Sequence, residues 1–218
     1  MQLHNLSETN SILNHFVSQL RNVDIQRDSM RFRRNIERIG EVLAYEISKT
    51  VDFSAVAVQT PLGVKNTYEM AAKPVICSIL RAGIPLHNGL LNYFDDADNG
   101  FVSAYRHHPN SDDDYFDILV EYQAVPDLSD RILILADPML ATGQSLVAVF
   151  NKLMEKGAPK EIHVAIVIAA PEGIELLQRN LPDQCHLWIA AIDEKLNEKN
   201  YIVPGLGDAG DLAYGNKL

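Results

Sequence analysis

The sequence predicts an α/β protein with a mostly parallel, twisted sheet flanked by helices. Four short apolar runs have the length and composition of buried strands, at residues 75–80, 132–136, 162–168 and 187–190. Strands of a parallel sheet read as continuous apolar runs because helices cover both faces of the sheet. Segments with helical periodicity lie between these runs, and such alternation is typical of parallel sheets with right-handed crossovers.

Two helices are expected before the first of these strands. Residues 7–22 carry apolar side chains at helical spacing, with Ser7 as the expected N-cap. Residues 28–50 continue with a longer helical pattern. Six arginines fall between Arg21 and Arg38. Little aromatic interleaving accompanies them, so we expect a solvated or subunit-facing side of the helix rather than a nucleic-acid patch.

Two regions interrupt the alternation of strand and helix. Residues 101–106 and 115–122 resemble strands around a polar loop, which predicts a hairpin over about 101–122 that stands off the sheet. The segment from Asn197 onward is rich in glycine and shows no helical period. No internal repeat or low-complexity linker is present. We therefore expect one domain over residues 1–218, with a small hood formed by the C-terminal segment.

Composition and charge argue against a nucleic-acid-binding protein, a membrane protein and a disulfide-bonded protein. The net charge of −10 over 218 residues disfavours generic nucleic-acid binding, because an acidic surface repels phosphate backbones. The first ten residues lack a signal-peptide pattern, and no apolar stretch reaches about 18 residues, so we expect a cytoplasmic protein with no membrane segment. Cys77 and Cys185 lie in or beside apolar runs without a CxxC partner, and we expect buried free thiols rather than a disulfide or metal site.

The segment from Ile132 to Ser145 is the strongest indication of chemistry. An apolar strand ends at Asp137, and a turn of small residues, Ala141-Thr142-Gly143, leads into a helical pattern. Ligands of open α/β sheets bind at the carboxyl ends of the strands. A helix that begins there directs free N–H groups and partial positive charge toward an anion. The segment therefore predicts a phosphate site.

Asp137 cannot contact a phosphate favourably, so we expect it to bind a ribose hydroxyl, or a magnesium ion directly or through water. An ordinary helix N-cap by Thr142 or Ser145 would also fit this turn. Neither common phosphate fingerprint, GxxxxGK[ST] or GxGxxG after a strand, is present.

Residues 136–145, Ala-Asp-Pro-Met-Leu-Ala-Thr-Gly-Gln-Ser, resemble the phosphoribosyl pyrophosphate (PRPP) motif of uracil phosphoribosyltransferases. Three further blocks agree with that family in order, at residues 78–83, 169–174 and 192–211. The resemblance covers nearly the whole chain beyond residue 20. It implies a type I phosphoribosyltransferase-like fold and the salvage reaction in which uracil and PRPP give UMP and pyrophosphate.

The resemblance also implies which residues hold PRPP. These are Arg81, Arg106, Asp137, Pro138, Met139, Leu140, Ala141, Thr142, Gly143, Gln144, Ser145 and Asp208. The two arginines would bind the pyrophosphate, because a guanidinium contacts phosphate oxygens in pairs. A surface ion pair is the alternative for Arg81, and an ordinary exposed arginine is the alternative for Arg106.

The glycine-rich segment near the C-terminus resembles the uracil-binding loop of the family. The residues carried over are Tyr201, Ile202, Gly207, Asp208 and Ala209. Uracil offers two carbonyl acceptors and an N–H donor, and a glycine-rich loop can present backbone groups to match them. The resemblance places Asp208 beside the ribose and the pyrophosphate.

The expected catalytic residues are Arg81, Asp137 and Asp208, in electrostatic and positioning roles and with no general base assigned. Mg²⁺ is the expected cofactor, bound through the pyrophosphate of the substrate, with Asp137 and Asp208 as candidate protein ligands. Some members of the family are activated by GTP, which makes GTP a candidate effector. We expect a homodimer or a higher homo-oligomer.

The chain departs from the family pattern in three places. Gln144 stands where the family usually has glycine, Leu212 replaces a more usual basic residue, and the loop at 107–115 is more acidic than expected. His107 and His108 beside three aspartates could imitate a metal site, but a solvated loop is the expectation. Two other functions fit this fold: a nucleotide-sensing regulator that binds RNA or a protein, and a phosphoribosyltransferase for another base. The acidic balance and the C-terminal loop favour the enzyme.

Overall fold

The computed structural model describes residues 1–107 and 117–216, and for residues 105–107 and 117 it describes the backbone only. The helices are α1 (Ile12–Arg21), α2 (Ser29–Ser48), α3 (Gly83–Leu91), α4 (Gln144–Met154), α5 (Pro171–Asn180) and α6 (Ala209–Tyr214), with a short 3₁₀ helix η1 (Leu6–Glu8). The strands are β1 (Gln2–Asn5), β2 (Phe53–Thr60), β3 (Gly63–Met70), β4 (Val75–Leu80), β5 (Asp98–His107), β6 (Asp117–Ala124), β7 (Ile132–Ala136), β8 (Met139–Leu140), β9 (Glu161–Ala169), β10 (Cys185–Ile192), β11 (Lys195–Leu196) and β12 (Ile202–Val203).

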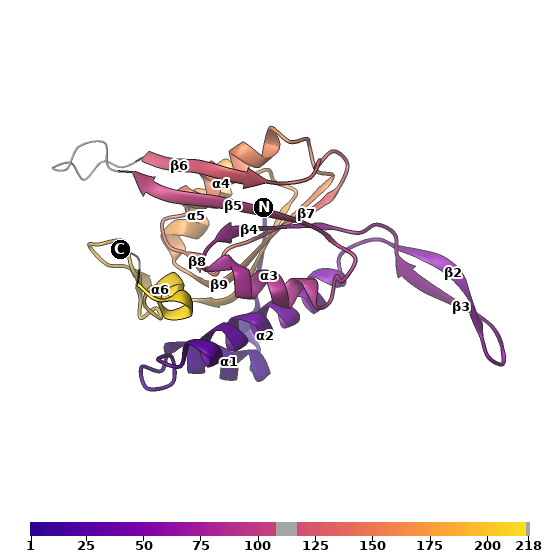
Figure 1. Cartoon of the computed structure of the whole chain (residues 1–218), viewed down its shortest axis with the longest axis horizontal. Helices are drawn as coiled ribbons and strands as arrows, with labels where there is room; N and C mark the ends of the chain where they lie inside the picture. Colours follow the sequence, from indigo (N-terminus) through magenta and orange to yellow (C-terminus); the bar gives the residue numbers. More distant parts are fainter. Residues whose placement is uncertain (108–116, 217–218) are drawn as a thin grey trace.

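The main sheet runs in the order β1-β10-β9-β7-β4-β5-β6 (Figure 1). All neighbours are parallel except β5 and β6, and the short β8 adds to the end of β9. The four predicted strand segments correspond to β4, β7, β9 and β10. The prediction of a mostly parallel sheet flanked by helices is therefore confirmed.

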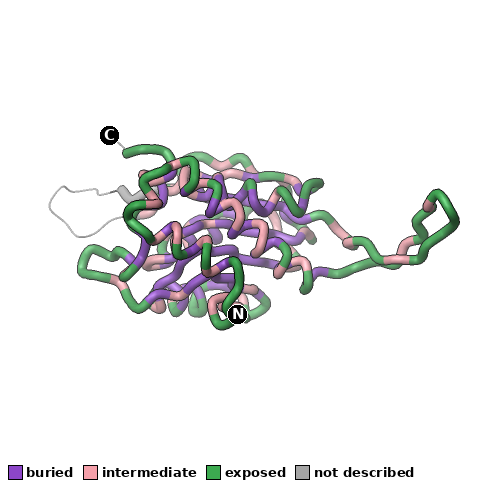
Figure 2. The backbone as a smooth tube through the Cα atoms, turned by 90° about the horizontal axis from the view of Figure 1, so that it is seen from below, coloured by how far each residue is buried: buried purple, intermediate pink, exposed green. Residues whose placement is uncertain are grey.

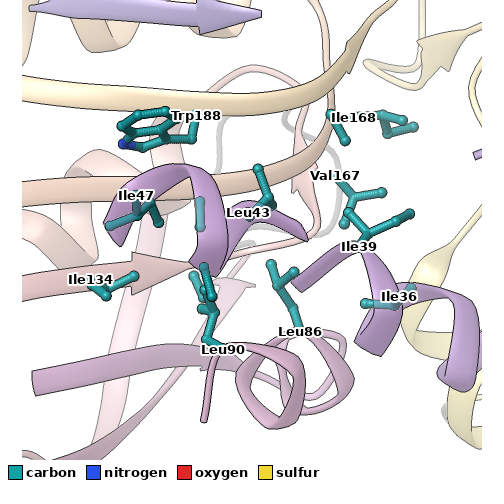
Figure 3. Close-up of a cluster of buried hydrophobic side chains, with 14 of the residues drawn as sticks. Ile36, Ile39, Leu43, Ile47, Leu86, Leu90, Ile134, Val167, Ile168 and Trp188 are labelled. Carbon is teal, nitrogen blue, oxygen red and sulfur yellow. The ribbon is translucent and has the colours of Figure 1, made fainter. Parts of the chain in front are cut away.

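Helices cover both faces of the sheet and bury a separate apolar cluster on each. Figure 3 shows one cluster, in which α2 packs on α3 and on side chains of the sheet; its labelled members are Ile36, Ile39, Leu43, Ile47, Leu86, Leu90, Ile134, Val167, Ile168 and Trp188. On the other face, α4 and α5 contribute Leu146, Val149, Phe150, Ile174 and Leu177. A Cβ on Gly89 would lie 2.0 Å from the carbonyl oxygen of Glu37, so α2 and α3 can approach this closely only with glycine there.

The N-terminal helix begins later than the sequence predicted. Its N-cap is Ser11, whose Oγ accepts the N–H of Leu13 at 3.2 Å, while the side chain of Asn14 accepts the N–H of Ser11 at 2.7 Å. The prediction of Ser7 as N-cap was wrong because this reciprocal pair caps the helix one turn later. Ser7 lies in η1, and the preceding β1 pairs with β10.

The hairpin predicted over about 101–122 exists as β5 and β6, but it does not stand off the sheet. β5 pairs with β4 along its first half, so the hairpin extends the main sheet. A different hairpin, β2–β3, projects away from the body of the protein (Figure 1), and Figure 2 shows that its residues are exposed or only partly buried. The acidic loop and His108 lie at 108–116, outside the described residues.

The C-terminal segment contains a short helix, α6, that the sequence did not predict. The side chain of Asp208 caps it by accepting the N–H of Asp211 at 2.9 Å. Six residues are too few to show a helical period, which explains the error. Both cysteines are buried and free, as predicted, and burial raises the pKa of the Cys77 thiol to about 12. Within the described part of the chain, every helix is too short or too polar to cross a membrane.

Candidate active site

A cavity of about 510 Å³ lies at the carboxyl ends of β4 and β7, where the C-terminal segment closes one side of it. Its lining consists of residues 79–82, Ala104, Asp137, residues 139–143, Ser145, Leu146, residues 199–202 and residues 207–210. Three sequence blocks that are far apart along the chain therefore meet at one cavity. Parallel strands place their carboxyl ends at the same edge of a sheet, which is why the two strand-to-helix turns are neighbours.

Most of the residues predicted for the two substrates line this cavity. They are Arg81, Asp137, Met139, Leu140, Ala141, Thr142, Gly143, Ser145, Tyr201, Ile202, Gly207, Asp208 and Ala209. Pro138 and Gln144 do not line it: Pro138 is buried, and Gln144 is exposed at the start of α4. The side chain of Arg106 lies outside the described residues, although its backbone pairs with Ile118 within β5 and β6.

The sequence did not predict every residue of the lining. Lys199 and Asn200, in the turn between β11 and β12, contribute to the cavity, as do Ala104 and Gly210. Lys199 and Asn200 directly precede the predicted uracil loop, and that adjacency was the available signal. Ala104 is brought to the cavity by pairing within the sheet, and its own sequence context gives no sign of this.

The turn between β8 and α4 brings the N-terminal end of a helix to the cavity. Gly143 has a φ of +83°, and a Cβ there would lie 2.9 Å from Cδ1 of Leu177, so glycine is required. Among the described non-glycine residues, a positive φ occurs at Asp130 and Asn200 and not at Gln144, so the φ of Gln144 is negative. Its N–H donates to Oγ1 of Thr142 at 3.4 Å. The first N–H groups of a helix lack intrahelical partners, so this end of α4 can donate to a phosphate.

Asp137 lies at the end of β7 and faces an unusual environment. Burial raises the pKa of its carboxyl to about 7, and the N–H of Met139, which donates to Oδ1 at 3.2 Å, only partly opposes that shift. A half-protonated carboxyl at neutral pH would be drawn into its charged form by a cation or by hydroxyl donors. Both roles that the sequence left open for Asp137 fit this environment.

Arg81 lies in the turn between β4 and α3 and reaches the C-terminal segment. Its Nη2 donates to Oδ1 of Asp211 at 3.2 Å and to the carbonyl oxygen of Gly215 at 3.1 Å. Its Nε is buried and has no hydrogen-bond partner among the described residues. A buried donor without a partner costs about 1–3 kcal/mol, so an anion that accepted from this guanidinium would recover that energy.

The predicted uracil loop lines the cavity with residues 201, 202 and 207–209 and turns at two glycines. Ile202 and Ala209 are buried, whereas Tyr201 is half exposed. Gly205 and Gly207 have φ values of +64° and +91°, conformations that favour glycine. A loop with this geometry can present N–H and C=O groups to the edge of a flat base.

The described residues contain no cluster of three or more His, Cys, Asp or Glu side chains arranged to hold a metal ion. The cavity does contain two carboxylates, Asp137 and Asp208. Such a pair suits Mg²⁺, which retains several waters and is commonly bound through one or two carboxylates together with substrate phosphates. A magnesium ion that enters with pyrophosphate therefore fits this donor set better than a resident metal does.

Comparison with known proteins gives consistent matches along the chain. The family model for uracil phosphoribosyltransferase matches residues 7–216. A uracil phosphoribosyltransferase of Porphyromonas gingivalis is 51% identical over 218 residues and the match covers both chains completely. One from Pyrococcus furiosus is 40% identical over 207 residues, which cover 93% of this chain and 85% of that relative.

A solved structure also matches the whole fold. A protein from Aquifex aeolicus superposes with a TM-score of 0.86 at 28% identity, with 98% of each chain covered. The mostly parallel sheet, the two strand-to-helix turns and the C-terminal segment therefore belong to an architecture that the two chains share. With the family model spanning almost its full length, the chain belongs to the uracil phosphoribosyltransferase family.

Proposed function

We propose that this chain transfers the phosphoribosyl group of PRPP to uracil and releases pyrophosphate, forming UMP in pyrimidine salvage. The observation that carries the proposal is the meeting of three features in one cavity: a helix N-terminus that can bind phosphate, a guanidinium with a free buried donor, and a glycine-rich loop. Each feature matches one part of the two substrates.

The reaction exchanges one bond at the anomeric carbon of the ribose. The bond to the pyrophosphate oxygen breaks, N1 of uracil forms the new bond, and N1 loses its proton. Negative charge grows on the departing pyrophosphate. Arg81 would give up its bonds to Asp211 and Gly215 and donate to pyrophosphate oxygens instead, which stabilises that charge in the transition state.

The rest of the site would act by positioning. The N-terminal end of α4 would hold a phosphate group of PRPP, and the loop around Ile202, Gly207 and Ala209 would hold uracil in line with the anomeric carbon. Asp137 and Asp208 would hold the ribose hydroxyls or the magnesium ion. Mg²⁺, when bound, supplies positive charge that neutralises the pyrophosphate. No general base is assigned.

The β2–β3 hairpin supports a second copy of the chain as a partner. Its apolar side chains Phe53, Leu62, Val64 and Tyr68 are 50%, 100%, 67% and 71% exposed. A two-stranded hairpin alone in water is marginally stable, and apolar exposure on this scale marks an interaction surface. We therefore propose a homodimer or higher homo-oligomer in which this hairpin contacts another subunit. We also propose a cytoplasmic location and activation by GTP. Adding GTP to the activity assay would test the second of these.

The direct experiment incubates the purified protein with uracil, PRPP and Mg²⁺ and identifies the products by chromatography and mass spectrometry. UMP and pyrophosphate should form in equal amounts. Absence of UMP, with a correctly folded protein, would refute the proposal and leave a nucleotide-sensing regulator as the alternative.

A further inference from the structure

We propose that the ion pair between Arg21 and Asp193 positions the uracil-binding loop, and that this pair therefore sets the affinity for the base. The inference rests on the proposed function of that loop. Neither residue lines the cavity, so both would act through the backbone of the loop and not by contact with a substrate.

Asp193 is a buried acidic residue, with 4% of its side chain exposed. It lies directly after β10, where its own N–H donates to the carbonyl oxygen of Ala169 at 2.8 Å. Its carboxylate accepts from both terminal nitrogens of Arg21, at 2.8 Å for Nη1 to Oδ2. Oδ2 also accepts the N–H of Gly205 at 2.9 Å. The carboxylate is thus anchored to the sheet and directed at the loop.

Arg21, the last residue of α1, completes the arrangement. Its Nη1 donates to the carbonyl oxygen of Gly205 at 2.9 Å. Both backbone groups of Gly205 are therefore held by one ion pair, the N–H by Asp193 and the carbonyl by Arg21. Bonds to charged partners are stronger than neutral ones, and the two-pronged geometry of the guanidinium adds direction.

Gly205 transmits this restraint to a residue that faces the cavity. Its φ is +64°, and a Cβ there would lie 2.2 Å from the carbonyl oxygen of Ile202. The chain therefore folds back over Ile202 at this point and continues to Gly207, and both of these residues line the cavity. A shift of Gly205 would move the backbone groups that are expected to meet uracil.

A second contact ties the same loop to the same part of the fold. The side-chain nitrogen of Gln26 donates to the carbonyl oxygens of Leu20, at 2.7 Å, and of Leu206, at 3.1 Å. The end of α1 and the residues that follow it are thus bonded to two successive carbonyls of the loop. Apart from Asp208, the PRPP side of the cavity is built from other elements, the turns at Arg81 and before α4, so mutations behind Gly205 should act mainly on the uracil side.

A buried ion pair is in general weak evidence for stability, because desolvation of the two charges offsets their attraction. Its geometry can nevertheless specify one backbone conformation. A structural role alone would lower the thermal stability of the variants without a preference between substrates. A positioning role would change the Michaelis constant for uracil selectively.

The test compares D193N and R21K with wild type and with a matched control, R131K. Arg131 pairs with Asp98 at 2.8 Å, and its side chain is 27% exposed, close to the 24% of Arg21. It directly precedes β7 and therefore lies at the amino end of that strand, whereas the cavity lies at the carboxyl end. Initial rates give the Michaelis constants for uracil and for PRPP, and thermal unfolding gives the fraction folded.

We expect the Michaelis constant for uracil to rise at least about ten-fold in D193N and less in R21K, which keeps the charge, while the constant for PRPP changes less than about two-fold. R131K should match wild type in both constants. Equal increases for both substrates, or unchanged constants in folded R21K and D193N, would overturn the proposal, as would failure of both variants to fold. Inactive wild type would instead refute the proposed function.

Discussion

Asp137 carries a carboxyl whose pKa is about 7, raised from 3.8 by burial. If the charged form holds ribose hydroxyls or Mg²⁺, protonation competes with PRPP. We predict that kcat/KM for PRPP falls about ten-fold per pH unit below pH 7. D137N should have lower activity than wild type at pH 7 and above, because bonds to a charged group are worth about 1.5–3 kcal/mol, and its profile should be flatter. A wild-type profile as flat as that of D137N would contradict this role.

The same carboxyl has an opposite effect on stability. Its raised pKa means that the folded state binds more protons than the unfolded state between the two pKa values, 3.8 and about 7. Its contribution to the free energy of unfolding is therefore complete below about pH 4 and is lost as the pH rises to 7. Binding of PRPP and Mg²⁺ should release protons in this range.

Gln144 stands at the first position of α4, where its side chain is exposed and does not line the cavity. Its backbone N–H remains at the end of the helix whichever side chain it carries. We predict that Q144G changes the Michaelis constant for PRPP by less than about ten-fold, equivalent to about 1.4 kcal/mol, and less than D137N does. If Q144G proves more damaging than D137N, the side chain is a specific ligand contact and the turn does not act through its backbone.

At the scale of elements, burial decided what the sequence could predict. β4, β7, β9 and β10 were recognised because helices cover both of their faces, which leaves continuous apolar runs. The β2–β3 hairpin was not, because all of its residues are exposed or only partly buried, so burial imposes no strand pattern on its sequence. β1 has only four residues at the edge of the sheet, too few for a pattern.

The exposed hairpin gives a prediction about assembly. Val64 and Tyr68 lie on the same face of β3, since side chains four residues apart in a strand point the same way. The wild-type protein should sediment at a multiple of its 24.3 kDa chain mass. The double variant V64S/Y68S should sediment as a monomer, because it removes apolar contact area. K65S changes an exposed residue on the other face of β3 and should assemble as wild type. A wild-type monomer would refute the proposed contact.

At the scale of the whole molecule, the net charge of −10 gave no indication of a phosphate-binding site, because the predicted site consists of a few local groups. The strand-to-helix turns and the glycine-rich loop were predictable because their residue types carry the chemistry. The contributions of Ala104 and of the pair Arg21 and Asp193 were not predictable from the sequence. Only the folded chain brings Ala104 to the cavity and the ion pair to the predicted uracil loop. No local pattern distinguishes Arg21 from the five other arginines of its region.

The metal requirement follows from the charges in the cavity. The described lining provides Arg81 and Lys199 against Asp137 and Asp208, so its side chains offer no net positive charge to pyrophosphate. We predict that EDTA abolishes UMP formation and that added Mg²⁺ restores it. Full activity after thorough chelation would remove the metal from the reaction. An assay of PRPP binding with and without Mg²⁺ would show whether the ion enters with the substrate.

The most direct test of the account is the ratio of kcat/KM for uracil and cytosine with PRPP and Mg²⁺. Cytosine places an amino group where uracil has a carbonyl, so backbone donors of the loop from Tyr201 to Ala209 would face another donor. A mispaired buried polar group costs about 1–3 kcal/mol. We predict that uracil gives UMP and that kcat/KM for uracil exceeds that for cytosine by at least about ten-fold. Comparable turnover of the two bases, or none with uracil, would contradict it.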